Sequence, residues 1–466
     1  MTDEAKQEKD AAAEEERAEA GYDIDPAIVE GILEALEAED DVSVRELVAP
    51  LHEADVADIF EQIGSADRAR LVRALGADFD VWVLSELDEG VRDEIVGLLS
   101  PETLAEAAQE LDSDDLVYLV EDLEDEAKAR VLDALDDDDR VIVEQSLTYP
   151  EESAGRMMQR ELVKAPPFWT VGQMIDYMRA AEDLPDPFYD VIIVDPAMKP
   201  VGTIPLSRIM GHPRPAVLGE IMDEEFRAIP VTQDVEDVAY AFNQYHLVSA
   251  PVVDETGRLV GVITIDDAVE ALSEEAEEDI LRLAGVGDES MADRVWDTTK
   301  SRFPWLAVNL VTAIVASLVI AQFDTVIAQY VALAVLLPIV ASMGGNAGTQ
   351  TLTVAVRALA TRDLTASNMW RVILRELLVG LGNGLAFAVI IAIVGYVWFG
   401  DPMLGVVLAV AMVVNLVVAG LAGIMIPIGL EKAGADPALA SGAFVTTVTD
   451  VVGFFAFLGL AAVLLL

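Results

Sequence analysis

Residues 445–455 read VTTVTDVVGFF, and they lie in a run from Pro437 to Leu466 whose one charged residue is Asp450. A helix of about 20 apolar residues crosses a bilayer, so this run predicts a membrane span. A carboxylate near the middle of a span costs roughly 2.5–3.5 kcal/mol to insert. A cation, water or a partner side chain must offset that cost. Asp450 is therefore the first candidate for a functional residue.

Four further uncharged runs predict four more spans, and they cover residues 303–323, 325–356, 377–400 and 402–430. Lysine and arginine gather before the first span, between the second and third, and between the fourth and fifth. Basic loops stay on the cytoplasmic side of a membrane. We therefore expect a multi-pass protein of the cell membrane, with a cytoplasmic N-terminal half and the C-terminus outside.

The net charge of −54 is concentrated in residues 1–302, which carry all but two of the excess negative charges. This balance argues against nucleic acid as a partner and favours cations. Adaptation of an acidic surface to high salt, as in halophilic proteins, is the favoured explanation for the bulk of this charge, because only seven lysines occur. Acid density alone therefore cannot locate a metal site. Cysteine is absent, which excludes disulfides and thiolate metal sites.

The residues that precede the membrane spans fall into regions with different sequence patterns. Residues 1–24 predict an acidic disordered tail without a cleavable signal peptide. Residues 25–148 repeat short segments with helical spacing, which predicts an α-helical superhelix of the kind that often serves as a scaffold. Residues 149–265 contain a helix followed by strand, turn and strand, and this unit occurs twice, about 58 residues apart.

These two α/β repeats resemble a tandem pair of cystathionine-β-synthase (CBS) repeats, on the strength of PVVD at 251–254 and GVITIDD at 261–267. In such repeats a Thr-x-x-Asp motif, here Thr264 and Asp267, can bind the ribose and phosphate of a nucleotide such as ATP. The first repeat has PLSR at residues 205–208 and lacks the acid, so nucleotide is weakly supported. Many such repeats serve only as dimerising, mobile modules.

Residues 266–300 connect the repeats to the first span and begin with a strongly acidic helix. Glu270, Glu274 and Glu278 are four residues apart and share one helix face. Like charges at this spacing destabilise a helix by a few tenths of a kcal/mol per pair. Divalent cations, a basic partner or high salt would each relieve the repulsion, and a cation-binding role is favoured by the position of the helix.

The second span contains Pro338 and the sequence GGNAGTQ at residues 344–350. Proline removes a helix donor, and interrupted backbone in a membrane is tolerated where it lines a wet cavity. The alternative is a seam of small residues that lets helices pack closely. Asn415 in the fourth span is a further polar group that could form a hydrogen bond across helices.

From about residue 30 to its end, the chain resembles the MgtE family of magnesium channels. The motifs that carry the resemblance are ESAGRMM at 152–158, GGNAGTQ at 344–350, RALATRD at 357–363 and TTVTDVVG at 446–453. The resemblance implies a homodimer in the lipid bilayer. Each chain is expected to be a multidomain membrane protein with a cytoplasmic α-helical superhelix, a tandem CBS pair, a connecting plug helix and a five-helix transmembrane pore domain in residues 301–466.

The resemblance also implies which residues handle Mg²⁺. The expected pore residues are Asp450, Gly344, Gly345, Asn346, Gly348 and Asn415. The expected regulatory acids are Asp114, Asp115, Asp267, Glu270, Glu275, Glu278 and Asp279. The implied function is a Mg²⁺-selective channel for magnesium uptake, which closes when cytoplasmic Mg²⁺ binds the N-terminal domain, the CBS pair and the plug helix.

Two other functions remain open. One is an ion-coupled exchanger for divalent cations, with Co²⁺ or Mn²⁺ as further substrates beside Mg²⁺. The other is a membrane-anchored metal sensor that does not transport. An enzyme is disfavoured, because the sequence contains no Walker loop, no nucleophile–base pair and no cluster of histidines for a metal.

Overall fold

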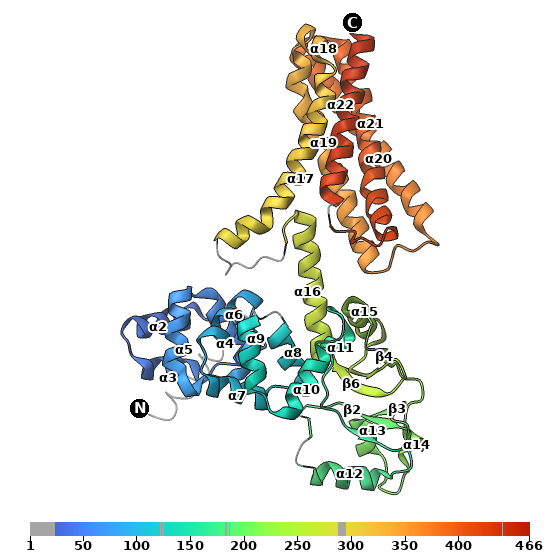
Figure 1. The fold of residues 1–466 in the computed structure, drawn as a ribbon. Helices are drawn as coiled ribbons and strands as arrows, with labels where there is room; N and C mark the ends of the chain where they lie inside the picture. Colours follow the sequence, from blue (N-terminus) through green and yellow to red (C-terminus); the bar gives the residue numbers. More distant parts are fainter. Residues whose placement is uncertain are drawn as a thin grey trace, which may run out of the picture. The chain divides into compact units, whose positions relative to one another are not determined.

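The computed structural model describes residues 24–121, 123, 125–181, 184–185, 187–287, 295–439 and 441–466 (Figure 1). The chain forms two compact units, which divide within helix α16 between Ser273 and Glu274. The predicted acidic tail lies outside the described residues except for Ile24. The five-part division by residue number stays a prediction.

The first unit begins with short helices around one hydrophobic core, as the helical spacing predicts. Asp25, Asp40 and Ser100 each accept a backbone N–H at the start of a helix, which fixes where the chain turns. The elements are α2 (Pro26–Glu37), α3 (Asp41–Val48), α4 (Glu53–Gln62), α5 (Ser65–Leu75), η1 (Gly76–Asp78), η2 (Val81–Leu84), α6 (Glu89–Leu98), α7 (Pro101–Glu110), α8 (Ser113–Glu121), α9 (Asp125–Ala134) and α10 (Asp137–Ser146).

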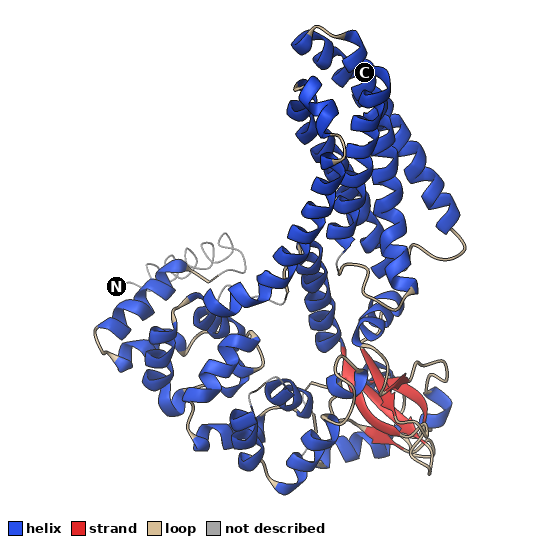
Figure 2. Ribbon diagram, turned by 45° about the horizontal axis from the view of Figure 1, so that its top comes forward, coloured by secondary structure: helices blue, strands red, loops and turns tan. Residues whose placement is uncertain are grey.

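Two three-stranded sheets follow, drawn in red in Figure 2, and they have the same topology. In each sheet the first strand pairs parallel to the second, and the second pairs antiparallel to the third. This confirms the predicted repeat. The strands are β1 (Lys164–Ala165), β2 (Asp190–Val194), β3 (Pro200–Pro205), β4 (Ile229–Pro230), β5 (Ser249–Val253) and β6 (Leu259–Thr264), with helices α11 (Ala154–Met157), α12 (Val171–Ala180), α13 (Leu206–Gly211), α14 (Leu218–Ile221) and α15 (Val235–Tyr245).

Helix α16 (Ile265–Ala284) is the predicted acidic helix, and it contributes residues to both units. The second unit continues with helices that are mostly apolar. Within its described residues, five helices are long and apolar enough to cross a membrane, as predicted. They are α17 (Val295–Ala321), α19 (Ala332–Ala360), α20 (Met369–Phe399), α21 (Pro402–Lys432) and α22 (Ser441–Leu464), and the short helix α18 (Asp324–Gln329) lies between the first two.

Two details of the second span differ from the sequence prediction. The span begins at Ala332, because residues 324–329 form the separate helix α18 and Tyr330 leaves helical geometry. Neither Pro338 nor the glycines interrupt α19, which is one continuous helix. The expectation of broken backbone at this depth was wrong. The reason is packing, since Gly344 and Gly348 are buried against neighbouring helices.

Close helix contacts in the membrane unit depend on single glycines. A Cβ at Gly380 of α20 would lie 2.7 Å from the carbonyl oxygen of Leu416 on α21, whereas a Cβ at Gly382 would meet nothing within 4 Å. Backbone approach of this kind replaces the hydrophobic effect as the main source of helix association in lipid.

We expect Gly380→Ala to lower the thermal midpoint of the detergent-solubilised protein, because α20 and α21 must separate, at a cost of about 1–3 kcal/mol. Gly382→Ala is the matched control in the same helix, and it should leave the midpoint unchanged or slightly raised. Equal effects of the two substitutions would show that α20 and α21 do not pack through Gly380.

Candidate functional site

Asp450 lies on α22 beside the face that this helix buries. Val445 and Thr449 are fully buried on that face, and Asp450 is half-buried. Among the described residues, none forms a hydrogen bond or an ion pair with the Asp450 carboxylate. The carboxylate therefore lacks a protein partner within one chain, in a helix that is apolar enough to span a membrane.

Helix α19 exposes a polar face in its middle part, between Ser342 and Thr353. Ser342, Asn346, Thr349 and Thr353 are all exposed and recur at helical spacing. Their side chains bond within the helix: the Asn346 amide donates to Ser342 at 3.4 Å, and the hydroxyls of Thr349 and Thr353 donate to backbone oxygens one turn earlier. We call these four residues, with Gln350, the polar stripe. Polar groups at membrane depth face water or protein and not lipid.

The polar stripe borders the helix that carries Asp450. A Cβ at Gly345, next to Asn346, would lie 3.9 Å from Cγ2 of Thr446, one turn before Asp450 on α22. At Gly348 a Cβ would lie 2.5 Å from Cγ1 of Val445. The polar stripe and Asp450 are thus on adjacent helices in close contact, and both are accessible in the isolated chain.

Asn415 of α21 has a different position from the other expected pore residues. Its side chain is fully buried between Gly344 of α19 and Gly453 of α22, and a Cβ on either glycine would collide with its amide. Its Nδ2 donates to the carbonyl oxygen of Val340 at 2.8 Å, and its Oδ1 has no hydrogen-bond partner among the described residues. Asn415 therefore lies behind the polar stripe and spaces α19 from α22.

In the first unit, α8 and the start of α16 bring three of the expected regulatory acids together. Burial raises the pKa of Asp114 well above its usual range, and the charge of Asp267 raises it further. Burial and the same Asp267 charge raise the pKa of Asp115 to about 7. Burial also raises the pKa of Asp267, to about 6. We call Asp114, Asp115 and Asp267 the α8–α16 acid cluster.

Thr264 and Asp267, the expected nucleotide-binding pair, bond to each other. The Asp267 carboxylate accepts the backbone N–H of Thr264 at 3.1 Å and its hydroxyl at 2.9 Å. Thr264 is buried, and its hydroxyl also contacts Asp266. A ribose or phosphate would have to displace these bonds.

The remaining acids of α16 lie in two different places. Glu270 belongs to the first unit and is exposed, whereas Glu275, Glu278 and Asp279 belong to the second unit and are half-buried. Glu278 forms an ion pair with Arg282 one turn later, and Arg282 also pairs with Asp436, which precedes α22. Burial raises the pKa of Asp279, and the charge of Asp436 raises it further.

Sequence reasoning missed Arg282 and Asp436. Arg282 is the one basic residue of a very acidic helix, and this feature of the sequence could have identified it. No feature of the sequence identifies Asp436 as its partner, since the two residues are far apart in the chain. In the part of the chain that the structure describes, no group of three or more histidine, aspartate or glutamate side chains is placed to hold a metal ion.

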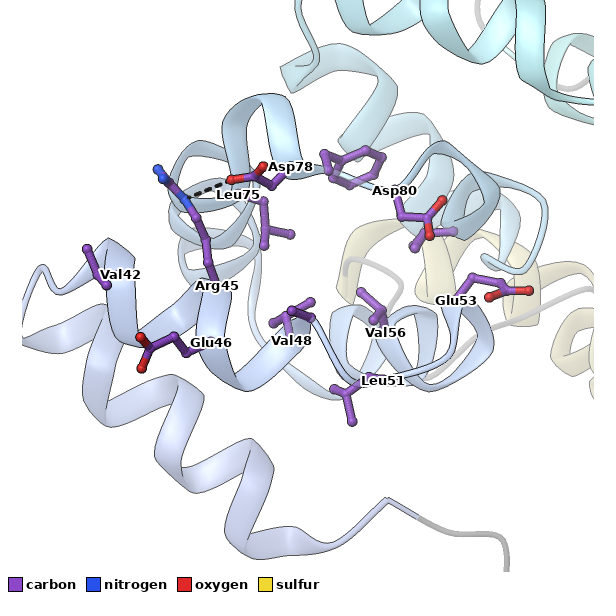
Figure 3. A pocket seen from close by; sticks show the side chains of 13 residues that line it. Val42, Arg45, Glu46, Val48, Leu51, Glu53, Val56, Leu75, Asp78 and Asp80 are labelled. Atoms are coloured by element: carbon purple, nitrogen blue, oxygen red, sulfur yellow. Dashed lines mark ion pairs between the residues drawn. The ribbon is translucent and has the colours of Figure 1, made fainter.

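A cavity of about 490 Å³ lies among the N-terminal helices, away from the expected site residues of the first unit (Figure 3). Apolar side chains line it, among them Val48, Val56 and Leu75, together with charged ones. Arg45 and Asp78 form an ion pair in the lining, with 3.5 Å between Nε and Oδ2. The described carboxylates of the lining are not grouped to hold a metal ion, so the cavity is not the candidate site.

Comparison with known proteins decides the family. The family described as divalent cation transporter, MgtE, matches residues 337–460, the MgtE intracellular N domain matches residues 51–152, and a CBS domain matches residues 218–274. The magnesium transporter MgtE of Thermus thermophilus is 33% identical over 443 residues, which cover 93% of this chain and 97% of that protein. The chain belongs to the MgtE family.

A second curated relative agrees with this assignment, and a solved structure is also similar in part. The magnesium transporter MgtE of Bacillus subtilis is 29% identical over 419 residues, 90% of this chain and 93% of that protein. A crystal structure of the cytosolic domain of the Mg²⁺ channel MgtE in complex with ATP is 30% identical, covers 52% of this chain and 99% of that chain, and has a TM-score of 0.48. The MgtE fold and the multi-pass membrane character are confirmed, and the family consists of transporters and not enzymes.

The α8–α16 acid cluster makes the stability of the first unit depend on pH. Because the pKa of Asp115 is raised to about 7 in the folded state, folded protein binds more protons than unfolded protein between about pH 4 and pH 7. The free energy of unfolding should therefore fall as the pH rises through this window. Hydrogen exchange of α8 amides in the full-length, metal-free protein measures this change, after correction for intrinsic exchange rates.

Asp115→Asn should slow exchange at pH 7.5 and reduce the pH dependence, because the neutral amide removes one repelling charge. Asp137→Asn, at an exposed aspartate of α10, is the control and should change neither. An unchanged pH dependence in Asp115→Asn would contradict the raised pKa.

Proposed function

We propose that this chain forms a homodimeric, Mg²⁺-selective channel that mediates magnesium uptake across the cell membrane and closes when cytoplasmic Mg²⁺ binds its acidic residues. The observation that carries this proposal is the exposed polar stripe of α19 beside Asp450 in two membrane-spanning helices. Membership in a family of divalent cation transporters and relatives named magnesium transporters support it.

The polar stripe favours a second copy of the chain as the partner. Lipid cannot solvate Asp450 or Asn346, whereas a two-fold dimer would cover both and enclose water between the two copies. Mg²⁺ dehydrates reluctantly and keeps several waters when bound. Two Asp450 carboxylates would hold the hydrated ion through its water shell, and the ion would offset their mutual repulsion.

Asn415 supports this arrangement from behind the helices. Its bond to the Val340 carbonyl and its contacts with Gly344 and Gly453 hold α19 and α22 at a fixed separation. Gly453 follows Asp450 by one turn, and Gly344 is two residues before Asn346. The buried amide thus positions the two segments that would contact the ion, and takes no direct part in coordination.

The proposed orientation follows from the basic loops and gives each part its role. Residues 25–148, 149–265 and 266–300 would form the cytoplasmic N domain, CBS pair and plug helix, and residues 301–466 the pore domain. The C-terminus would lie outside. This orientation exposes the α8–α16 acid cluster to cytoplasmic Mg²⁺, where a sensor of the transported ion belongs.

The α8–α16 acid cluster suits a feedback gate because its charges are held together at a cost. Raised pKa values of Asp114, Asp115 and Asp267 mean that ionisation at neutral pH is opposed by burial and repulsion. A divalent cation would remove the repulsion and stabilise this arrangement over an open one. A ligand shifts a two-state equilibrium only by such a difference in affinity.

Nucleotide binding stays a prediction. Thr264 and Asp267 satisfy each other in this structure, so ATP would compete with the contacts that start α16. Because Asp267 also belongs to the α8–α16 acid cluster, nucleotide and Mg²⁺ would act on the same residue.

Asp450→Ala should abolish Mg²⁺ flux into proteoliposomes while leaving a folded dimer, because the hydrated ion loses the carboxylate that is proposed to hold it. Asp324→Ala, at an exposed aspartate between the first two spans, is the control and should retain flux. Undiminished flux in Asp450→Ala would remove the pore assignment and favour a non-transporting sensor. Uphill flux driven by a proton or sodium gradient would favour the exchanger.

Neutralising the α8–α16 acid cluster by Asp114→Asn, Asp115→Asn and Asp267→Asn together should keep the channel open at higher Mg²⁺. Coupling energies between sites are commonly 1–3 kcal/mol, so the Mg²⁺ concentration for half-closure should rise about 5-fold to 150-fold. Patch recording of the reconstituted protein measures it, with Asp137→Asn as the control. Normal closure of the triple variant would place the sensor elsewhere.

A further inference from the structure

The last turn of α16 carries a guanidinium between two carboxylates. Arg282 Nη1 donates to Oδ2 of Asp436 at 2.7 Å, and Nη2 pairs with the carboxylate of Glu278. The side chains of Arg282, Asp436 and Glu278 are 29%, 26% and 18% exposed. Partly buried ion pairs are screened less than fully exposed ones. The Arg282 pairs therefore contribute more to the position of the end of α16 than fully exposed pairs would.

The carboxylate of Asp436, which pairs with Arg282, is held in one orientation by the backbone. Its second oxygen, Oδ1, accepts the backbone N–H of Ala438 at 2.7 Å, which orients the carboxylate in the segment between α21 and α22. Ala438 is buried in a small cluster with Val356 of α19 and Val445 of α22, and Leu283 of α16 packs against this cluster. An ion pair and an apolar contact at consecutive residues thus join α16 to the two helices that carry the polar stripe and Asp450.

The acids around Arg282 would repel one another without it. Glu278 and Asp436 both pair with Arg282, and they lie far apart in the chain. The guanidinium supplies positive charge at the point where these two carboxylates converge, and its planar fork can serve both at once.

We propose that Arg282 is a positioning residue of the gate: its ion pairs with Glu278 and Asp436 hold the end of α16 against the ends of α19 and α22 without any metal. The proposal rests on the proposed function and adds that docked α16 corresponds to the closed pore. Closure then has two contributions. Arg282 provides one that is always present, and Mg²⁺ bound by the acids provides one that depends on concentration. Arg282 therefore sets how much Mg²⁺ is needed to close the channel.

Arg282→Gln in the full-length channel should raise the Mg²⁺ concentration for half-closure roughly fivefold, because the docked state loses its built-in cation. Asp436→Asn should have a similar effect, since asparagine keeps an acceptor for the Ala438 N–H and removes the charge. The double variant should need no higher Mg²⁺ concentration for half-closure than the single variants, because both substitutions remove the same ion pair. Arg282→Lys, which keeps the charge but not the fork, should be intermediate.

Two matched controls separate this effect from a general loss of charge. Arg371→Gln changes an exposed arginine at the start of α20. Asp401→Asn changes an aspartate that, like Asp436, accepts a backbone N–H two residues later, here that of Met403 at 2.8 Å. Both variants should have the same Mg²⁺ concentration for half-closure as the wild type. An unchanged value in Arg282→Gln, or additive effects in the double variant, would overturn the proposal.

A second measurement follows docking without transport. The chain contains no cysteine, and a Cβ at Gly442 of α22 would lie 3.7 Å from the carbonyl oxygen of Leu283. Leu283→Cys with Gly442→Cys should form a disulfide under mild oxidation in Mg²⁺-free buffer. Adding Arg282→Gln should slow that reaction severalfold, and Mg²⁺ should restore part of the rate. An unchanged rate would overturn the proposed role of Arg282.

The two measurements also separate this proposal from the proposed function. Slower disulfide formation together with a shifted half-closure supports both. Slower disulfide formation with no change in Mg²⁺-dependent closure supports the Arg282 contact, and contradicts the assignment of docked α16 to the closed pore.

Discussion

A carboxylate in a membrane-spanning helix must be solvated by something other than lipid, and the membrane unit is built around that constraint. Asp450 lies half-buried on α22 with no protein partner in the described chain. The adjacent α19 turns a polar face outward next to it. Behind both helices, the buried Asn415 amide and a pair of glycines hold them together. Water and a cation beside the polar stripe of α19 and Asp450 of α22 would account for all of these features.

Carboxylates that are partly buried must also be offset outside the membrane helices. The α8–α16 acid cluster and the end of α16 differ in how this happens. In the α8–α16 acid cluster, burial and neighbouring carboxylates raise the pKa values, and a mobile cation would offset both. At the end of α16, Arg282 already provides the positive charge. Helix α16 thus begins in the α8–α16 acid cluster and ends at the basic side chain of Arg282. For this reason we propose that Mg²⁺ acts at the acid cluster, whereas Arg282 holds the end of α16 at any Mg²⁺ concentration.

The sequence was sufficient for the features that depend on composition and local pattern. Five apolar runs, the repeated β-turn-β unit and the acidic helix were all predicted, because hydropathy and period are local properties. Strands β1 and β4 were missed, since two residues are too few to show alternation. The continuity of α19 through Pro338 and the glycines was misjudged, because a glycine that breaks a helix and one that packs against Asn415 look identical in sequence. The pair of Arg282 and Asp436 joins distant parts of the chain and needed the fold.

The most direct test of the central claim is whether water reaches the polar stripe. With no native cysteine, single cysteines at Asn346 and Thr349 can be probed with a charged, water-soluble thiol reagent in proteoliposomes, beside Leu385→Cys on the exposed apolar face of α20. We predict that the stripe cysteines react, that Mg²⁺ slows their reaction, and that the α20 cysteine does not react. Stripe cysteines as unreactive as the one on α20 would contradict a water-filled ion path along α19.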